Sequence, residues 1–374
     1  SMVHALVYAD RFDLEGLVGA DSSAVILYSD AVNVDYRTNV AVDSILPRTK
    51  DKIASYFKAD SAFHPAPGKY MDLTVSLPKT DWLTGLVLPK LHAITVKNFT
   101  GHYDSDADEL KLNIDIPELD YDSIAVTNLA VNVNAKGNAL SSQLAVERAT
   151  YDSLSIDGLS LTSVTKLGAL DNTLRVQNGK SPPSYQLTVQ AKRKDKETTL
   201  HIVPEGLVLD QEEWTADPKN LLRLVATGGV MAEHFDLHSK DQSVQVVTGE
   251  KSTRITVAGF RIGTLLNFVS SADSTQFAAG ELSGSVDLPT DNTPGLKADL
   301  KVHDLVLVGD PMGDLSITAD ETTRKHYAAQ VSLKNGKNNL IGKASIDASG
   351  SSPVVHGAAD VALTDLSVFK PFTK

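Results

Sequence analysis

Apolar and polar residues alternate with a period of two along most of this chain. The clearest run places an aliphatic residue at every second position from Leu110 to Ile116, and shorter runs follow at 129–133, 187–191 and 255–257. Successive side chains of an extended strand point to opposite faces, so each run gives one apolar and one polar face. The pattern predicts a mainly β fold, an elongated curved antiparallel sheet of hairpin repeats with about twenty strands.

Helical periodicity is confined to two short stretches. Residues 51–57 bring Ile53, Tyr56 and Phe57 to one side, and residues 262–269 bring four aliphatic residues to one side. Clusters of Gly, Pro, Asn, Asp and Lys, which favour turns, stand between the strand-like runs. We therefore expect a few short helices among many hairpins.

A six-residue phrase recurs along the chain. It carries apolar residues at its first, third and sixth positions and Asn, Asp or Gly at its fifth. It begins at Ile94, Ile124 and Leu154, which are 30 residues apart, and again at Leu300 and Val361, which are 61 residues apart. Repeats of this length are typical of stacked supersecondary units.

The regularity of the pattern also suggests how the chain is organised. We expect residues 1–70 to form a less regular β segment with a short helix, and residues 71–374 to form one repetitive groove-like body. No apolar run approaches the roughly 20 residues that a membrane-spanning helix needs. The two ends resemble cut edges, so we expect the chain to be a central segment of a longer protein.

The phrase changes the parity of the apolar positions: Val126 has an even number and Leu129 an odd one. A shift of one residue would turn every later side chain to the other face of a straight strand. The parity changes at the fifth position of the phrase, and we call the residue there the step residue. In every copy it is of a type that tolerates positive φ, so we expect a bulge or corner that keeps the apolar side chains on one face. A tight turn between separate strands is the alternative. The step residues are Asn98, Asn128, Gly158, Asp304 and Asp365.

The function depends on what lies against the aliphatic face. It can be the core of a closed sandwich, packed on another sheet. It can also line an open U-shaped groove for acyl chains, where each buried CH₂ contributes about 0.8 kcal/mol. The candidate lipid-groove wall comprises Ile94, Val96, Phe99, Ile114, Ile116, Ile124, Val126, Leu129, Val131, Leu154, Ile156, Leu159, Leu161, Leu300, Val302, Leu305 and Leu307.

Composition narrows the possible functions. The 374 residues carry 35 basic and 47 acidic side chains, a net charge of −12, which disfavours a nucleic-acid-binding surface. The chain has no cysteine, which excludes disulfides, thiol catalysis and thiolate metal sites. Hydrophobic residues make up 42 % of the chain but aromatic residues only 6 %, so an apolar surface would be mainly aliphatic.

Motifs that carry chemistry are absent or weak in the sequence. Asp104, Asp106 and Asp108 resemble the start of a calcium-binding loop, but Glu109 stands where the loop needs Gly, and we expect a hairpin tip instead. His234 and His238 lack the neighbouring Glu of a zinc-protease motif. There is no phosphate-binding loop, nucleophile elbow or dinucleotide fingerprint. We therefore expect no enzyme, no cofactor and no metal.

The recurring phrase and the order of several landmarks resemble the AsmA-like superfamily, and within it the TamB branch, the translocation and assembly module proteins, as it occurs in Bacteroidetes. The resemblance covers most of residues 70–374. Its landmarks are the segment Trp82–Leu91, the Gly101–Asp104 turn, the Leu207–Asn220 stretch that contains Trp214, and the Gly280–Leu288 run followed by Leu296–Leu300.

The resemblance implies a cell-envelope function. Members of the family have an inner-membrane anchor, a periplasmic β-taco or β-groove, and in some cases a C-terminal part that engages an outer-membrane barrel of the Omp85 class. It implies that this chain is part of a periplasmic conduit for phospholipid acyl chains that serves outer-membrane biogenesis, with the anchor and the barrel-binding part outside this chain.

Two other functions remain open. A structural or chaperone-like scaffold would support outer-membrane protein assembly by offering sheet edges to client strands, that is, by β-augmentation. A cell-surface adhesin or carbohydrate-binding solenoid is less favoured. It would need exposed aromatic clusters, and Trp82 and Trp214 have no aromatic neighbours in the sequence.

Overall fold

The computed structural model shows a mainly β protein with two compact units, residues 1–181 with 190–194 and residues 182–189 with 195–374. The helix expected at 51–57 and the landmark Trp82 lie outside the described residues. The structure describes residues 12–19, 22–40, 67–78, 80, 88, 90–137, 139–152, 154–166, 169–177, 183–194, 197–225, 230–267, 270–271, 278–290, 294–307, 309–336, 338–350 and 352–363.

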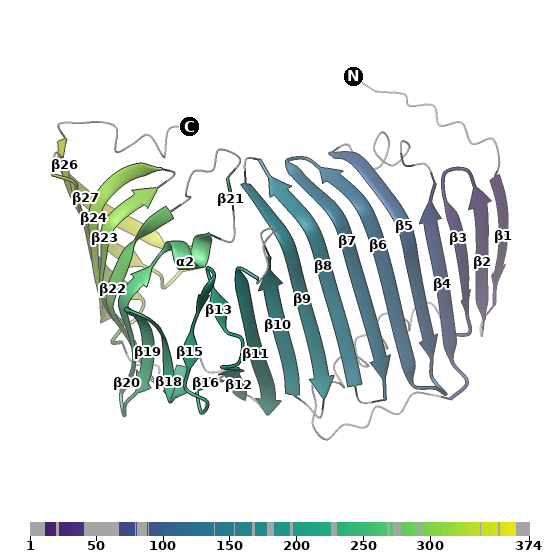
Figure 1. Cartoon of the computed structure of the whole chain (residues 1–374), viewed down its shortest axis with the longest axis horizontal. Helices are drawn as coiled ribbons and strands as arrows, with labels where there is room; N and C mark the ends of the chain where they lie inside the picture. Colours follow the sequence, from purple (N-terminus) through teal and green to yellow (C-terminus); the bar gives the residue numbers. More distant parts are fainter. Residues whose placement is uncertain are drawn as a thin grey trace. The chain divides into compact units, whose positions relative to one another are not determined.

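The first unit is an antiparallel sheet in which each strand from β1 to β10 pairs with the next one in the chain (Figure 1). This is the curved sheet of consecutive hairpins that the alternation predicts, and it does not close into a barrel. Its strands are β1 (Phe12–Val18), β2 (Ser23–Ser29), β3 (Asn33–Thr38), β4 (Tyr70–Leu77), β5 (Leu91–Asp104), β6 (Glu109–Tyr121), β7 (Ile124–Lys136), β8 (Ala139–Tyr151), β9 (Leu154–Lys166) and β10 (Ala169–Val176).

The second unit contains short strands followed by a second run of long hairpins. β18 to β20 and β22 to β27 pair antiparallel in chain order. The elements are β11 (Tyr185–Lys194), which crosses the boundary of the two units, β12 (Glu197–Ile202), β13 (Val208–Leu209), β14 (Glu212–Glu213), β15 (Thr215–Ala216), β16 (Leu221–Val225), β17 (Val230–Glu233), β18 (Phe235–Ser239), β19 (Gln242–Thr248), β20 (Ser252–Arg261), α2 (Gly263–Leu266), β21 (Ser270–Ser271), β22 (Ala278–Pro289), β23 (Lys297–Leu307), β24 (Asp310–Thr323), β25 (His326–Lys334), β26 (Asn338–Asp347) and β27 (Val354–Leu363).

Two local features bear on the boundaries expected from the sequence. Residues 33–38 of β3 form a regular ladder with residues 71–76 of β4, so antiparallel pairing continues across residue 70. The helix expected at 262–269 is described only as the single turn α2. Local periodicity shows which face of a segment is apolar, but it does not reveal the strand that pairs with it.

The recurring phrase bends two strands of the first unit without interrupting them. At Asn128 the backbone takes a φ of 50°, yet β7 continues through this residue. The register between β7 and β8 is the same on both sides of Asn128. Gly158 takes a φ of 65° at the same position of β9. Both residues are in-register corners, as the parity step predicts.

In two other copies of the phrase, the step residue lies in a β-bulge. Residues 97–98 of β5 oppose the single residue Ser76 of β4, and residues 303–304 of β23 oppose Asp314 of β24. Residue 304 also takes a φ of 49°. The prediction of a bulge or corner is therefore confirmed in all four copies that the structure describes, while Asp365 lies outside the described residues.

The structure also reveals a copy of the phrase that the sequence analysis missed, at residues 255–260. Here residues 258–259 of β20 oppose Ser283 of β22, and Gly259 takes a φ of 59°. A Cβ atom on Gly259 would lie 2.8 Å from the carbonyl oxygen of Asp241, so only glycine fits this bulge without movement of the backbone.

Candidate functional site

An unbroken row of apolar side chains crosses the first unit from β1 to β10. The row contains one residue from each strand, and every neighbouring pair is directly opposite in the antiparallel register. Directly opposite residues of antiparallel strands lie on the same face of the sheet, so all ten side chains share one face. The row is Leu14, Leu27, Val34, Val75, Phe99, Ile114, Val131, Leu144, Leu161 and Leu174.

Further apolar rows run beside it over the long strands. One row contains Ile116, Leu129, Val146, Leu159 and Val176. Another, beyond the corner residues, contains Ile94, Leu119, Val126, Ala149 and Ile156. A last row at the hairpin ends contains Leu91, Tyr121, Ile124, Tyr151 and Leu154. Twelve of the thirteen wall residues predicted in this unit fall in these four rows, and Val96 pairs with Leu77 of β4.

The opposite face of the same strands is polar. A row of uncharged hydroxyl and amide side chains crosses β4 to β10, and Asn113 Nδ2 donates a hydrogen bond to Thr100 Oγ1 at 3.4 Å within it. Lys97 and Asp115 form an ion pair at 3.4 Å. The sheet therefore has two chemically different faces. The polar row is Thr74, Thr100, Asn113, Asn132, Gln143, Thr162 and Thr173.

The apolar face of the first unit remains partly accessible. None of its thirteen predicted wall residues is buried, and Ile124 and Leu161 are 43 % and 38 % exposed. In the part of the chain that the structure describes, the clusters of buried apolar residues all belong to the second unit. On this face Leu91, Val146 and Val176 are buried, while the other members of the four rows stay partly accessible.

The predicted wall residues of the second unit have a different environment. Val302 and Leu305 are only 8 % and 7 % exposed and form a buried cluster with Met312. Leu307 packs against this cluster, while Leu300 is half-buried and pairs with Ile317 of β24. These residues contribute to a packed interior of their own unit.

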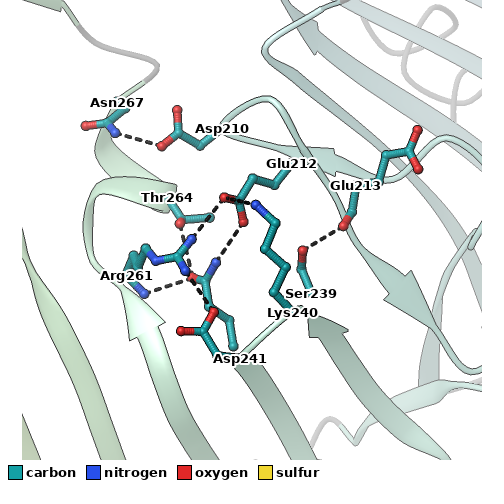
Figure 2. A network of polar contacts seen from close by, with 10 residues as sticks. Asp210, Glu212, Glu213, Ser239, Lys240, Asp241, Arg261, Thr264 and Asn267 are labelled. Carbon is teal, nitrogen blue, oxygen red and sulfur yellow. Dashed lines mark hydrogen bonds and ion pairs between the residues drawn. The ribbon is translucent and has the colours of Figure 1, made fainter.

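A network of polar contacts ties together the short strands of the second unit (Figure 2). Glu212 of β14 accepts hydrogen bonds from Lys240 Nζ and Arg261 Nη1, both at 2.9 Å. The side chain of Gln242, only 1 % exposed, donates to Glu212 Oε2 at 3.1 Å and accepts from the Arg261 backbone N–H at 2.9 Å. Arg261 also contacts Asp241 at 2.8 Å.

The charges of this network compensate one another. The hydrogen bond from Lys240, followed by the charge of Arg261, lowers the pKa of the Glu212 carboxyl. Each charged group of the network has an opposite charge beside it, which is the arrangement that fixes strands and turns in place.

The weak motifs of the sequence have structural explanations. Asp104 Oδ1 accepts hydrogen bonds from the backbone N–H groups of Asp106 and Ala107, at 2.8 and 3.0 Å, and thereby closes the turn between β5 and β6. These bonds, from Ala107 and then Asp106, lower the pKa of the Asp104 carboxyl. The hairpin-tip prediction is confirmed. His234 and His238 lie near different carboxylates, those of Asp217 and Asp236 respectively.

Comparison of the chain with protein-family models, curated protein sequences and solved structures gives no match. Within the described residues, no helix combines the length and the apolar character required to cross a bilayer.

Proposed function

We propose that the apolar face of the first unit binds acyl chains, and that the protein is a non-enzymatic periplasmic conduit for phospholipid between the inner and outer membranes. The observation that carries this proposal is the ten-residue apolar row from β1 to β10, which stays partly accessible. The resemblance to the TamB branch supports the same function. It also suggests inner-membrane anchoring and an Omp85-class barrel partner through parts outside this chain.

The dimensions of the row suit a hydrocarbon chain. Neighbouring strands lie about 4.8 Å apart, so ten strands give a path of about 43 Å. The acyl chains of one leaflet occupy about 15 Å, half of the hydrocarbon core of a bilayer. The row can therefore hold a whole acyl chain with room to move along it. Each buried CH₂ would contribute about 0.8 kcal/mol, before the cost of ordering the chain.

A matched pair of variants on β7 tests the proposal. Val131→Asp places a charge in the apolar row. Asn132→Asp places the same charge at the next position of β7, where the side chain lies on the polar face of the sheet. A phospholipid with a photoreactive acyl chain should label the natural sequence and N132D but not V131D, provided that all three give the same circular dichroism spectrum. The proposal would be contradicted if V131D and N132D were labelled equally, or if the natural sequence were not labelled at all.

The scaffold function is a second candidate, because strand β1 presents a favourable edge. Among the described residues, β1 pairs only with β2, and its side chains Phe12, Leu14 and Leu17 are exposed. Such an edge can accept a client strand by β-augmentation. A photoreactive residue at position 15, on β1 but on the face opposite to Leu14, would then cross-link to unfolded outer-membrane strands, whereas a residue at position 131 would not. Cross-links from position 131 without any from position 15 would contradict the edge mechanism.

A further inference from the structure

The bulge in β23 brings three potential metal ligands together on the surface of the second unit. His303 and Asp304 both oppose Asp314, because β23 has one more residue than β24 at this point. A bulge re-aims side chains in this way, so that two neighbours in the chain can serve one site. Glu281 of β22 lies directly opposite His303 in the register and adds a third carboxylate charge nearby. Four groups from three strands therefore meet here.

The distances define a compact site. His303 Nδ1 lies 2.7 Å from Asp314 Oδ1, and His303 Nε2 lies 3.3 Å from Asp304 Oδ2. The backbone N–H of Asp304 donates to Asp314 Oδ1 at 3.1 Å, which holds that carboxylate in position. One ligand atom from each of the three residues lies within 4.8 Å of the others, and no other such group of three occurs among the described residues.

Two of these atoms are spaced as two ligands of one zinc ion would be. Two ligands with bonds of about 2.1 Å at a tetrahedral angle lie about 3.4 Å apart, close to the observed separation of Nε2 and Asp304 Oδ2. Metal-binding histidines usually donate the other ring N–H to a carboxylate, a backbone carbonyl or water, which fixes the tautomer and the ring orientation. Asp314 is placed to accept that N–H from Nδ1.

We propose that His303 Nε2 and the Asp304 carboxylate bind a divalent transition-metal ion of the zinc class, with Asp314 as the positioning residue for the imidazole. Water molecules would complete the coordination, because all three side chains are well exposed, at 69, 83 and 60 %. An imidazole with carboxylates suits zinc, nickel or copper better than calcium or magnesium, which bind through oxygen.

The chain contains a natural control for this site. His326 Nε2 lies 3.4 Å from Asp347 Oδ2, a similar pair on β25 and β26, but its Nδ1 faces the backbone carbonyl oxygen of Arg324 at 3.0 Å. A histidine and a single carboxylate are thus available elsewhere on the same unit, and among the described residues no second carboxylate completes a group of three with them. Non-specific binding of metal to surface histidines would affect both places equally.

Calorimetric titration of the full chain with Zn²⁺ tests the proposal, and the absorption of tetrahedral Co²⁺ reports the coordination independently. The natural sequence and His326→Ala should show the same saturable site, and His303→Ala should lack it. Asp314→Asn should weaken binding by about 10- to 100-fold, the usual effect of losing an orienting carboxylate. The absence of a saturable site, its persistence in H303A, or equal losses in H303A and H326A would overturn the proposal. Because these residues are exposed, unchanged thermal unfolding without metal should show that each variant folds.

Discussion

Val126 and Leu129 lie on the same apolar face of one continuous strand, although they are three residues apart. Both are less exposed than Thr127 and Asn128, which separate them. In a regular strand, residues of opposite parity would point to opposite faces. The φ of 50° at Asn128 changes which face the following side chains occupy, while the register with β8 stays the same. The corner therefore lets two apolar rows continue on one face of a long strand.

The left-handed backbone at Asn128 leads to the first prediction. Asn128→Val should lower the free energy of unfolding by about 1–3 kcal/mol, because a β-branched residue is strained at positive φ. Asn128→Gly is the matched control, since it also removes the side-chain hydrogen bond to Glu147 but accepts the backbone conformation. Urea unfolding measures both variants. Equal stability of N128V and N128G would show that the corner does not depend on this conformation.

A second prediction concerns the close approach of β22 and β23. A Cβ atom on Gly284, which has a φ of 142°, would lie 2.1 Å from the carbonyl oxygen of Asp299. Gly284→Ala should therefore destabilise the protein by several kcal/mol, in the range of the larger effects of single substitutions. Gly342 on β26 has open space around its Cβ position, so Gly342→Ala should have little effect. Thermal unfolding of the two variants tests the difference, and similar melting temperatures would contradict it.

The buried amide of Gln242 gives a third prediction. Gln242→Leu would leave the Arg261 backbone N–H, the buried Thr264 hydroxyl and one oxygen of the partly exposed Glu212 carboxyl without this partner. We expect a loss of about 1–3 kcal/mol in total. Gln245→Leu on the same strand is the control, because Gln245 is exposed. Denaturant unfolding should show a large loss for Q242L and almost none for Q245L. If both variants unfold at the same denaturant concentration as the natural sequence, the network contributes no stability.

The fourth prediction is a pH dependence of stability. The hydrogen bond from Lys240, and then the charge of Arg261, hold the pKa of the Glu212 carboxyl below the ordinary value of 4.5. A lowered pKa in the folded state contributes stability above pH 4.5, and this stability is lost as the pH falls through the folded value. The natural sequence should therefore lose more stability than Glu212→Gln between neutral pH and about pH 3. Unfolding curves at both pH values measure this difference, and equal losses would contradict it.

Much of the fold follows from the sequence, because a sheet with one apolar face needs a regular alternation. The change of parity predicts the corners at Asn128 and Gly158 without knowledge of the partner strands. The apolar residues before and after the fifth position can share one face only if the backbone conformation changes between them. The copy that contains Gly259 was missed because no other copy stands one or two repeat lengths away from it. The pattern also did not distinguish a bulge from a corner, because that depends on the partner strand.

The sites that depend on pairing between strands could not be predicted from the sequence alone. Glu212 and Arg261 are 49 residues apart, and neither stands in a motif that indicates the other. His303 and Asp304 belong to the repeated phrase, but their relation to Asp314 arises from the register shift in β23. Similarly, a single strand shows an alternation but not the position at which its apolar residues align with those of nine other strands.

The uniformity of the ten-residue row has a consequence for motion. All its members are aliphatic except Phe99, and one follows the next at every strand spacing of about 4.8 Å. A hydrocarbon chain that slides by one strand would exchange each contact for another of nearly the same kind, and single contacts contribute only about 0.1–0.2 kcal/mol. The energy profile along the row is then shallow and periodic, without a deep trap. Under the proposed function, an acyl chain would therefore move over the row by diffusion.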